Sequence, residues 1–162
     1  MSSIREQIMV LVKAKLETIT TSNGYNTDVQ KVERFRITPV SRSELPSIYI
    51  FEEKENVTAS GAQVNLGLYA SEMIISLECW VKDKSTEKAT QINSLLEDVV
   101  KAMQDNYRWE NSGGVALAID TIYNGNRSLI QLASTKGNGY LGLLVFFTIQ
   151  YRCKFGYLAS RV

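Results

Sequence analysis

The sequence predicts an α+β fold, with a mainly antiparallel β-sheet and two α-helices packed on one of its faces. Two stretches, near residues 4–19 and 89–103, repeat apolar residues at helical spacing. Other stretches alternate apolar and polar residues with the period of a strand, and the longest of these is Tyr140–Phe155. The order helix, strands, helix, strands is typical of an α+β sandwich.

The first predicted helix begins at a capping box, in which Ser3 is the N-cap and Glu6 follows three residues later. Its apolar stripe, with Met9 beside it, consists of Ile4, Ile8, Val12, Leu16 and Ile19. The helix is expected to stop within residues 20–24, where Gly24 supplies a left-handed exit.

The sequence between the helices predicts three strands, the third at residues 72–82, and a further strand that belongs to a hairpin. Residues 29–37 predict a strand of moderate length, and residues 47–53 predict a short one that opens after Pro46. Residues 54–63 are polar and are expected to be mobile, and residues 64–68 add one strand of a hairpin.

The stretch from Glu72 to Lys82 separates two faces clearly. One face is apolar, with Met73, Ile75, Leu77, Cys79 and Val81. The other carries Ser76, Glu78, Trp80 and Lys82 and is expected to face water.

The second helix follows N-cap candidates at residues 83–86 and ends near Asn106. Its apolar stripe is formed by Ala89, Ile92, Leu95, Leu96, Val99 and Met103. A strand is then predicted at residues 115–123. Asn124-Gly125 follows it and is a strong hairpin signal, so residues 127–133 are expected to form the returning strand.

The long stretch Tyr140–Phe155 is expected in the middle of the sheet. One of its faces is apolar throughout, from Leu141 to Phe155, whereas the other turns from apolar to polar at Thr148. Its first half therefore predicts cover on both faces and its second half on one.

Composition indicates one globular domain spanning residues 1–162. The chain is 44% hydrophobic and 22% charged, it has no apolar run long enough for a membrane helix, and its start lacks a signal-peptide pattern. Cys79 and Cys153 lie in apolar strand patterns, so buried free thiols are expected, with a disulfide between neighbouring strands as the alternative.

Charge is distributed unevenly along the chain. All 17 acidic residues lie in residues 1–120, whereas residues 121–162 carry bases alone, at Arg127, Lys136, Arg152, Lys154 and Arg161. This asymmetry is either surface decoration or a pair of complementary patches that register one copy against another, or against a different protein.

No stretch predicts a catalytic, cofactor or metal site. Histidine is absent from the sequence, which removes the common triads and most zinc sites. Glu52 and Glu53 are neighbours on a strand end, so they face opposite sides and are best explained as a solvated terminus. Asp120 is a lone carboxylate, more typical of a wet face or an interface than of a catalyst. No basic cluster is dense enough to read a nucleic-acid sequence.

Several aromatic and basic side chains are instead candidates for contact surface, because exposed aromatics beside arginine are typical of interface anchors; for each single residue the alternative is partial burial under a loop. Trp80 lies on the polar face of its strand, and the others follow the second helix or end the last strand. The candidate contact residues are Trp80, Arg108, Trp109, Arg152, Lys154 and Tyr157.

The succession of motifs resembles the tail terminator (tail completion) proteins of long-tailed bacteriophages. The residues that carry the resemblance are the opening helix Ile4–Ile8, the stretch Leu16–Asp28 with its Asn-Gly-Tyr-Asn-Thr-Asp turn, and the strand Glu44–Glu53 with its Leu-Pro start. The chain length, the second helix after Trp80-Val-Lys-Asp83 and the long C-terminal strand agree with it.

The resemblance implies a structural role without cofactor. Such proteins form a ring, commonly a hexamer, that caps the tail tube, ends its polymerisation and presents the surface that joins the head connector or neck protein. DNA passes through the hole without being read. The chain would then be made in the host bacterial cytoplasm and would reside in the tail-neck region of the virion, with no membrane partner.

Two alternatives remain open at this level. One is another adaptor of the phage particle, such as a neck, head-completion or sheath-capping protein. The other is a small hydrolase or transferase that uses Asp120 or Glu52.

Overall fold

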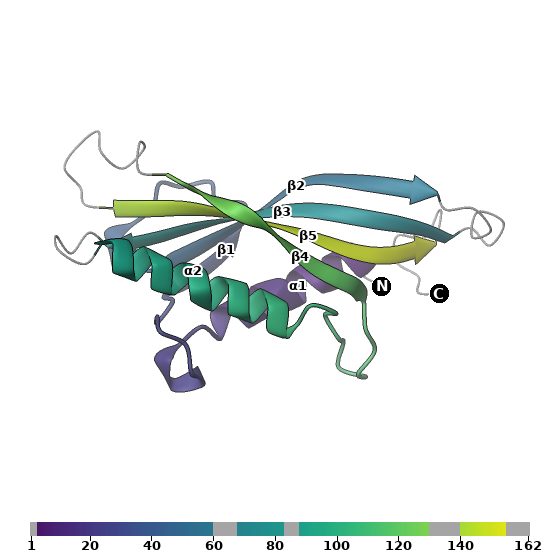
Figure 1. Cartoon of the computed structure of the whole chain (residues 1–162), viewed down its shortest axis with the longest axis horizontal. Helices are drawn as coiled ribbons and strands as arrows, with labels where there is room; N and C mark the ends of the chain where they lie inside the picture. Colours follow the sequence, from purple (N-terminus) through teal and green to yellow (C-terminus); the bar gives the residue numbers. More distant parts are fainter. Residues whose placement is uncertain (1–2, 60–67, 83–87, 130–139, 155–162) are drawn as a thin grey trace.

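The computed structural model describes residues 3–59, 68–82, 88–129 and 140–154. Within these residues a five-stranded sheet has the strand order β1-β2-β3-β5-β4. Both α-helices lie on the same side of the sheet (Figure 1). Three of its four strand pairs are antiparallel, and only β1 and β2 run parallel. The predicted α+β class is therefore confirmed.

Helix α1 spans Ile4–Glu17 and begins as the sequence predicts. Ser3 Oγ accepts a hydrogen bond from the Glu6 N–H at 3.1 Å, while the Glu6 carboxylate turns away to Arg34. The stripe Ile4, Ile8, Val12 and Leu16 is buried. Gly24, with φ 79°, ends a separate 3-10 turn at Thr21–Asn23. Helix α1 itself ends at Glu17, two residues before Ile19, the last residue of the predicted apolar stripe.

Strands β1 and β2 differ most from the sequence prediction. Strand β1 is only Lys31–Arg34, whereas β2 runs through Ser47–Ala59. The prediction of a mobile stretch from residue 54 is wrong as far as Ala59, because β3 (Leu68–Lys82) pairs with β2 up to Ala59. Cross-strand backbone pairing holds these polar residues in the sheet even though their composition predicts a loop.

Helix α2 spans Lys88–Asp105, and the following strand β4 spans Ala118–Ser128. Ala89, expected in the apolar stripe of α2, is exposed. The predicted hairpin at Asn124-Gly125 is wrong, because β4 continues past it and resumes pairing with β5 at Asn126. Gly125 has φ 100°, so this dipeptide forms a β-bulge and not a chain reversal.

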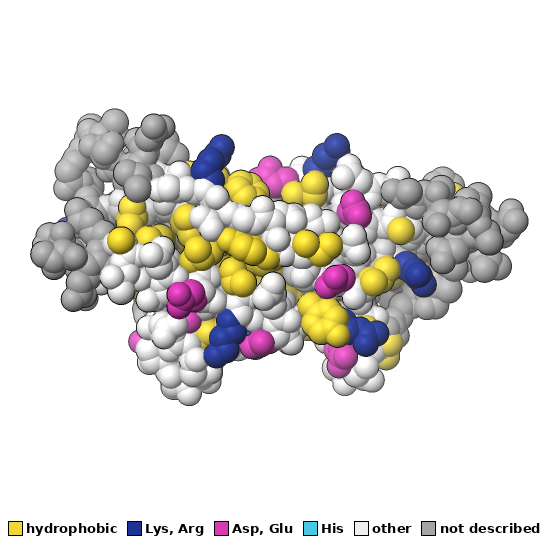
Figure 2. Space-filling model, viewed as in Figure 1, with side chains coloured by type: hydrophobic (Ala, Val, Ile, Leu, Met, Phe, Trp, Pro, Cys, Tyr) yellow, Lys and Arg dark blue, Asp and Glu magenta, His cyan; other side chains and the backbone are white. Residues whose placement is uncertain are grey.

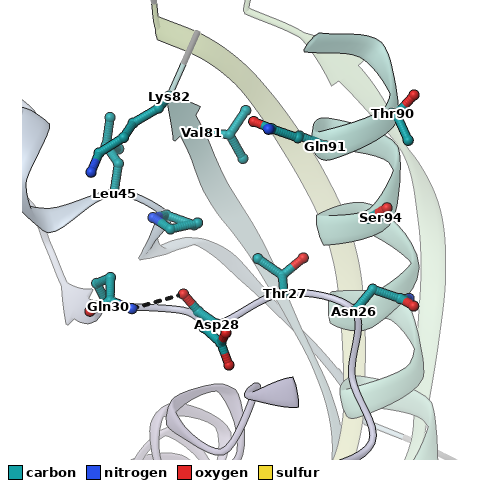
Figure 3. A pocket seen from close by; sticks show the side chains of 11 residues that line it. Asn26, Thr27, Asp28, Gln30, Leu45, Val81, Lys82, Thr90, Gln91 and Ser94 are labelled. Atoms are coloured by element: carbon teal, nitrogen blue, oxygen red, sulfur yellow. Dashed lines mark hydrogen bonds between the residues drawn. The ribbon is translucent and has the colours of Figure 1, made fainter. Parts of the chain in front are cut away.

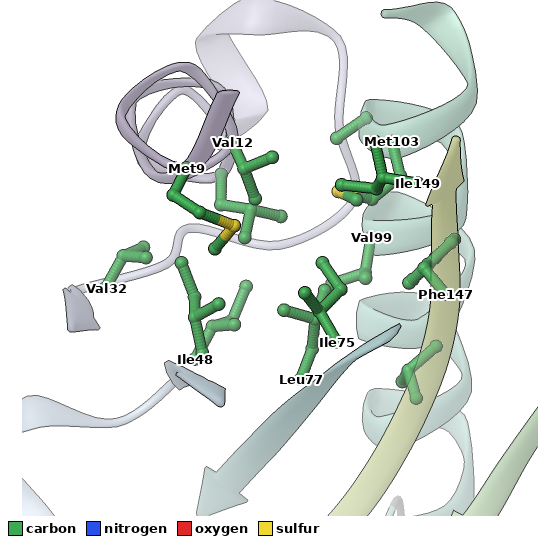
Figure 4. Close-up of a cluster of buried hydrophobic side chains, with 14 of the residues drawn as sticks. Met9, Val12, Val32, Ile48, Ile75, Leu77, Val99, Met103, Phe147 and Ile149 are labelled. Carbon is green, nitrogen blue, oxygen red and sulfur yellow. The ribbon is translucent and has the colours of Figure 1, made fainter. Parts of the chain in front are cut away.

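Strand β5 (Tyr140–Lys154) lies between β3 and β4, as an interior strand. The core occupies the space between the sheet and the two helices, where side chains from α1, α2 and the strands interdigitate (Figure 4). A smaller cluster on the opposite face is formed by Leu45, Tyr49, Trp80 and Leu129.

Cys79 and Cys153 are free and buried, as predicted. They face different residues of the neighbouring strand, Cys79 opposite Leu143 and Cys153 opposite Tyr69. Among the described residues, neither helix is long and apolar enough to cross a membrane.

Candidate contact surfaces

Trp80 is part of the small core cluster on the face opposite the helices. Its side chain is buried, its Nε1 donates to Glu78 Oε1 at 2.7 Å, and its ring lies against Gly142. The expectation of an exposed interface residue is wrong here. The polar face of β3 is covered at this end by Leu45 and Leu129, which belong to segments distant in sequence.

Trp109 is buried as well, although it follows α2 in a turn. Its backbone has φ 46°, and its Nε1 donates to Thr121 Oγ1 at 2.8 Å. The left-handed backbone turns the indole inward, under β4, where only 2% of the residue is exposed. The prediction that Trp109 is exposed is therefore wrong.

Arg108 and Arg152 are exposed, and the fold brings them to the same end of the sheet. The Arg108 carbonyl accepts from the Ala118 N–H at 2.9 Å, and Ala118 pairs with Tyr151, the neighbour of Arg152. Lys154 ends β5, and nothing is described of its side chain; Tyr157 lies outside the described residues. No contact with another chain tests the role of these residues.

Glu52 belongs to an ion-pair network that joins α1 to β1 and β2. Its carboxylate accepts from Arg5 Nε at 3.0 Å and from Arg34 Nη2 at 2.6 Å. Its side chain is only 6% exposed, so the expected solvated strand terminus is wrong. Glu53 faces the other side of the sheet and accepts from Ser76 Oγ, as their neighbouring positions predict.

Arg34 is the centre of this network. Its guanidinium also donates to both carboxylate oxygens of Glu6, at 2.7 and 3.0 Å, and this hydrogen bonding lowers the pKa of Glu6 and raises the pKa of Arg34 further. Glu55 extends the network by accepting from Tyr151 Oη. Each carboxylate has a fixed cationic or hydroxyl partner, an arrangement that clamps α1 onto the sheet.

Asp120, the other carboxylate considered for catalysis, is half-buried and accepts from the Thr121 N–H at 2.8 Å. This bond stabilises the bulge in β4 after Ala118. Within the described part of the chain, no group of three or more metal-ligating side chains gathers at one place.

A polar groove of about 410 Å³ lies between the loop before β1 and the first half of α2. Thr90, Gln91 and Ser94 of α2 face Asn26 and Asp28 across it (Figure 3). Gln30 Nε2 donates to the Asp28 carbonyl, and Asp28 Oδ1 accepts from the Thr21 backbone. The lining combines amides and hydroxyls with one acid, one base and the apolar residues Leu45, Pro46 and Val81, and the described hydrogen bonds join no nucleophile in it to a base.

The face of the molecule that carries α2 and β4 has apolar side chains at its surface. Figure 2 shows apolar side chains along this face, which carries α2 and β4. A groove of about 470 Å³ between the two elements has Leu96, Val100 and Tyr123 among its lining residues. On β4 itself, Ile119 and Ile122 are 45% and 39% exposed, and neither is among the residues that line the groove. We call this groove the α2–β4 groove.

The opposite edge of the sheet, at β1, also carries exposed apolar side chains. Phe35 is 48% and Ile37 95% exposed, directly after the last residue of β1. The sequence prediction placed both in a strand and did not consider them as contact residues. One signal was available: Val32 has an even number, whereas Phe35 and Ile37 are odd, so the apolar face switches within the predicted strand.

Comparison with solved structures gives a likeness in fold, whereas the sequence comparisons find nothing. No protein-family model matches the sequence. No curated protein matches it either. A solved structure titled "Virion of native gene transfer agent (GTA) particle" contains a chain that aligns over 93% of this chain and 92% of its own length, with 9% identity and a TM-score of 0.45. At this TM-score the likeness carries no argument about what the chain does.

Proposed function

We propose that this chain is a structural protein of a phage-like virion, which assembles into a ring of six copies on the end of the tail tube. The ring ends tube polymerisation and presents the surface that joins the head connector. DNA passes through its hole without sequence-specific contact, and the chain acts without catalysis or cofactor. It is made in the cytoplasm of the host bacterium and resides in the tail-neck region of the particle.

One observation carries the proposal: both edges of the sheet are fitted for contact. Strand β4 is an edge strand of 11 residues with two exposed isoleucines. A long edge with apolar side chains invites pairing with another chain. The β1 edge likewise carries exposed apolar side chains, those of Phe35 and Ile37. Two different edges on one chain favour a head-to-tail assembly, which forms a ring if its rotation closes.

The resemblance of the opening helix, the Asn-Gly-Tyr-Asn-Thr-Asp turn and the Leu-Pro strand to tail terminator proteins supports the same role. In the structure, that turn is fixed by α2. Asp98, which is 1% exposed, accepts from the Asn26 N–H at 2.9 and 3.0 Å, and Lys101 Nζ donates to the Gly24 carbonyl at 3.0 Å. A rigid turn of this kind suits a building block of an assembly.

Electron microscopy of the purified chain, with and without assembled tail tubes, tests the proposal. We expect closed annuli on tube ends and a six-fold mass in native mass spectrometry. A chain that stays monomeric at high concentration and leaves tube ends bare contradicts it. Binding to the connector or to a contractile sheath, with bare tube ends, assigns the chain instead to the other adaptors of the particle.

A further inference from the structure

The segment after β1, residues 35–42, exposes the side chain of Ile37 to solvent; we call this segment the ridge. Ile37 is 95% exposed, yet Arg36 beside it is anchored: its Nη2 donates to Glu78 Oε1 at 2.7 Å, and its guanidinium lies 5.2 Å from the centre of the Tyr49 ring. On the other side, Val40 packs against the small core cluster. Ile37 is therefore presented by a segment that is fixed on both sides, which lowers the entropy cost of binding.

The backbone before Ile37 supports the same reading. Phe35 has φ 54°, a conformation that a bulky residue rarely adopts, and its N–H still donates to the Ile50 carbonyl at 3.0 Å. This left-handed residue turns the chain out of β1. Such a conformation persists where the surrounding structure fixes it, and it is found often at binding sites.

The α2–β4 groove offers a complementary surface. Its apolar lining comes from Leu96, Val100 and Tyr123, and the Tyr123 ring is itself held against Phe147, with 5.6 Å between ring centres. Glu97 and Asp105 are the acids that line it. Its one base, Lys101, already donates to the Gly24 carbonyl and lies over the Tyr25 ring.

The charges of the ridge and of the groove are opposite in sign. The ridge, residues 35–42, contains no acidic residue; Arg36 is paired with Glu78, which leaves Arg42 as its exposed base. The groove carries two acids against one base, Lys101, which keeps its charge while it donates to the Gly24 carbonyl. A basic ridge with an apolar tip therefore fits an apolar groove with an acidic lining.

We infer that Ile37 of one copy of this chain packs into the α2–β4 groove of the next copy. The inference rests on the proposed ring, because it requires a second copy as the partner. The ridge follows β1 and the groove adjoins β4, at the two ends of the strand order. One ridge and one groove per copy give a heterologous contact that repeats around a ring and leaves neither surface free.

A cross-link between two different variants tests the contact directly. I37C places a thiol on the ridge, and Q104C places one at an exposed residue that lines the groove. Cys79 and Cys153 are buried, so they do not compete in the folded chain. Mixing I37C with Q104C under mild oxidation should give a disulfide-linked dimer, identified by mass spectrometry of the linked peptides. V10C, at a residue 53% exposed on α1, mixed with Q104C is the matched control and should give none.

Charge insertion gives a second, independent readout. I37E should weaken self-association at least about thirtyfold, the scale of a hot-spot residue, because a carboxylate enters an apolar groove. V10E makes a similar change on α1 and should leave association unchanged. Circular dichroism of both variants checks that they remain folded.

The possible outcomes separate the two proposals. A ring that survives I37E and gives no 37–104 cross-link overturns this contact while the proposed ring stands. A wild-type chain that does not associate, even with tail tubes, overturns the ring and this contact together.

Discussion

Substituting Gly142 by alanine tests the packing of the small core cluster. A Cβ at this position would lie 2.7, 2.8 and 2.9 Å from three ring carbons of Trp80. The Trp80 ring cannot easily move away, because it is buried and its Nε1 donates a hydrogen bond to Glu78. Overpacking of this kind costs about 1–3 kcal/mol, against a gain of about 0.4–1 kcal/mol from the less flexible unfolded chain.

We therefore expect G142A to lower the free energy of unfolding by about 1–2 kcal/mol, measured by urea titration. At roughly 2–4 °C per kcal/mol, the melting temperature should fall by several degrees. G113A is the control, since its Cβ would meet Asn111 Oδ1 at 3.3 Å, a contact that a shift of a few tenths of an ångström relieves.

A double-mutant cycle with W80L identifies the cause. W80L alone destabilises the cluster, but it removes the ring that the new methyl group meets, so the cost of G142A should shrink markedly in its presence. If G142A is as stable as the wild type, or if its cost is the same in both backgrounds, the contact between Trp80 and Gly142 does not limit the packing.

Three further changes probe the buried polar contacts. R34M should cost roughly 1–3 kcal/mol at pH 7. Because Arg34 lowers the pKa of Glu6, the share of stability due to Glu6 is present above the ordinary value of 4.5 and is lost as the pH falls below it, so the difference between R34M and the wild type in urea titrations should narrow from pH 5 to pH 3. D98A should cost about 1–3 kcal/mol by leaving the Asn26 N–H without its partner, and hydrogen exchange at that amide should accelerate. Burial raises the pKa of Tyr151, so wild-type stability should decline as the pH rises past the ordinary value of 10.0, and this decline should be smaller in Y151F in alkaline urea titrations, where the buried Cys79 still contributes to it.

The sequence predicts well what depends on local periodicity. The stripe Ile4–Leu16 and the cap at Ser3 place α1 correctly, and the alternation in Tyr140–Phe155 identifies an interior strand. In both cases the apolar residues that set the periodicity are also the residues that pack in the core, so the periodicity predicts their burial correctly.

The sequence prediction fails where contacts between segments distant in sequence determine the structure. Alternation assigns Trp80 to the polar face of its strand, but it cannot show that Leu45 and Leu129 cover that face. Asn124-Gly125 predicts a hairpin from local preference, whereas pairing with β5 on both sides of the dipeptide favours a bulge. Glu52 was expected in solvent because nothing near it in sequence marks Arg5 and Arg34 as its partners.

The candidate contact residues show the same limit. Arg108 and Arg152 were placed on the surface correctly, as charged residues usually are. The exposed Ile37 was missed, because an isoleucine in an alternating stretch predicts burial. Its exposure depends on the left-handed backbone of Phe35, which the sequence does not predict.

The place of β5 in the sheet has a consequence for synthesis on the ribosome. Strands β3 and β4 emerge before β5, yet β5 lies between them and pairs with both. A nascent chain therefore cannot complete its sheet until residues 140–154 have left the exit tunnel. A truncated product without them would have neither a finished core nor a correctly placed β4, so it would be excluded from any assembly built through that edge.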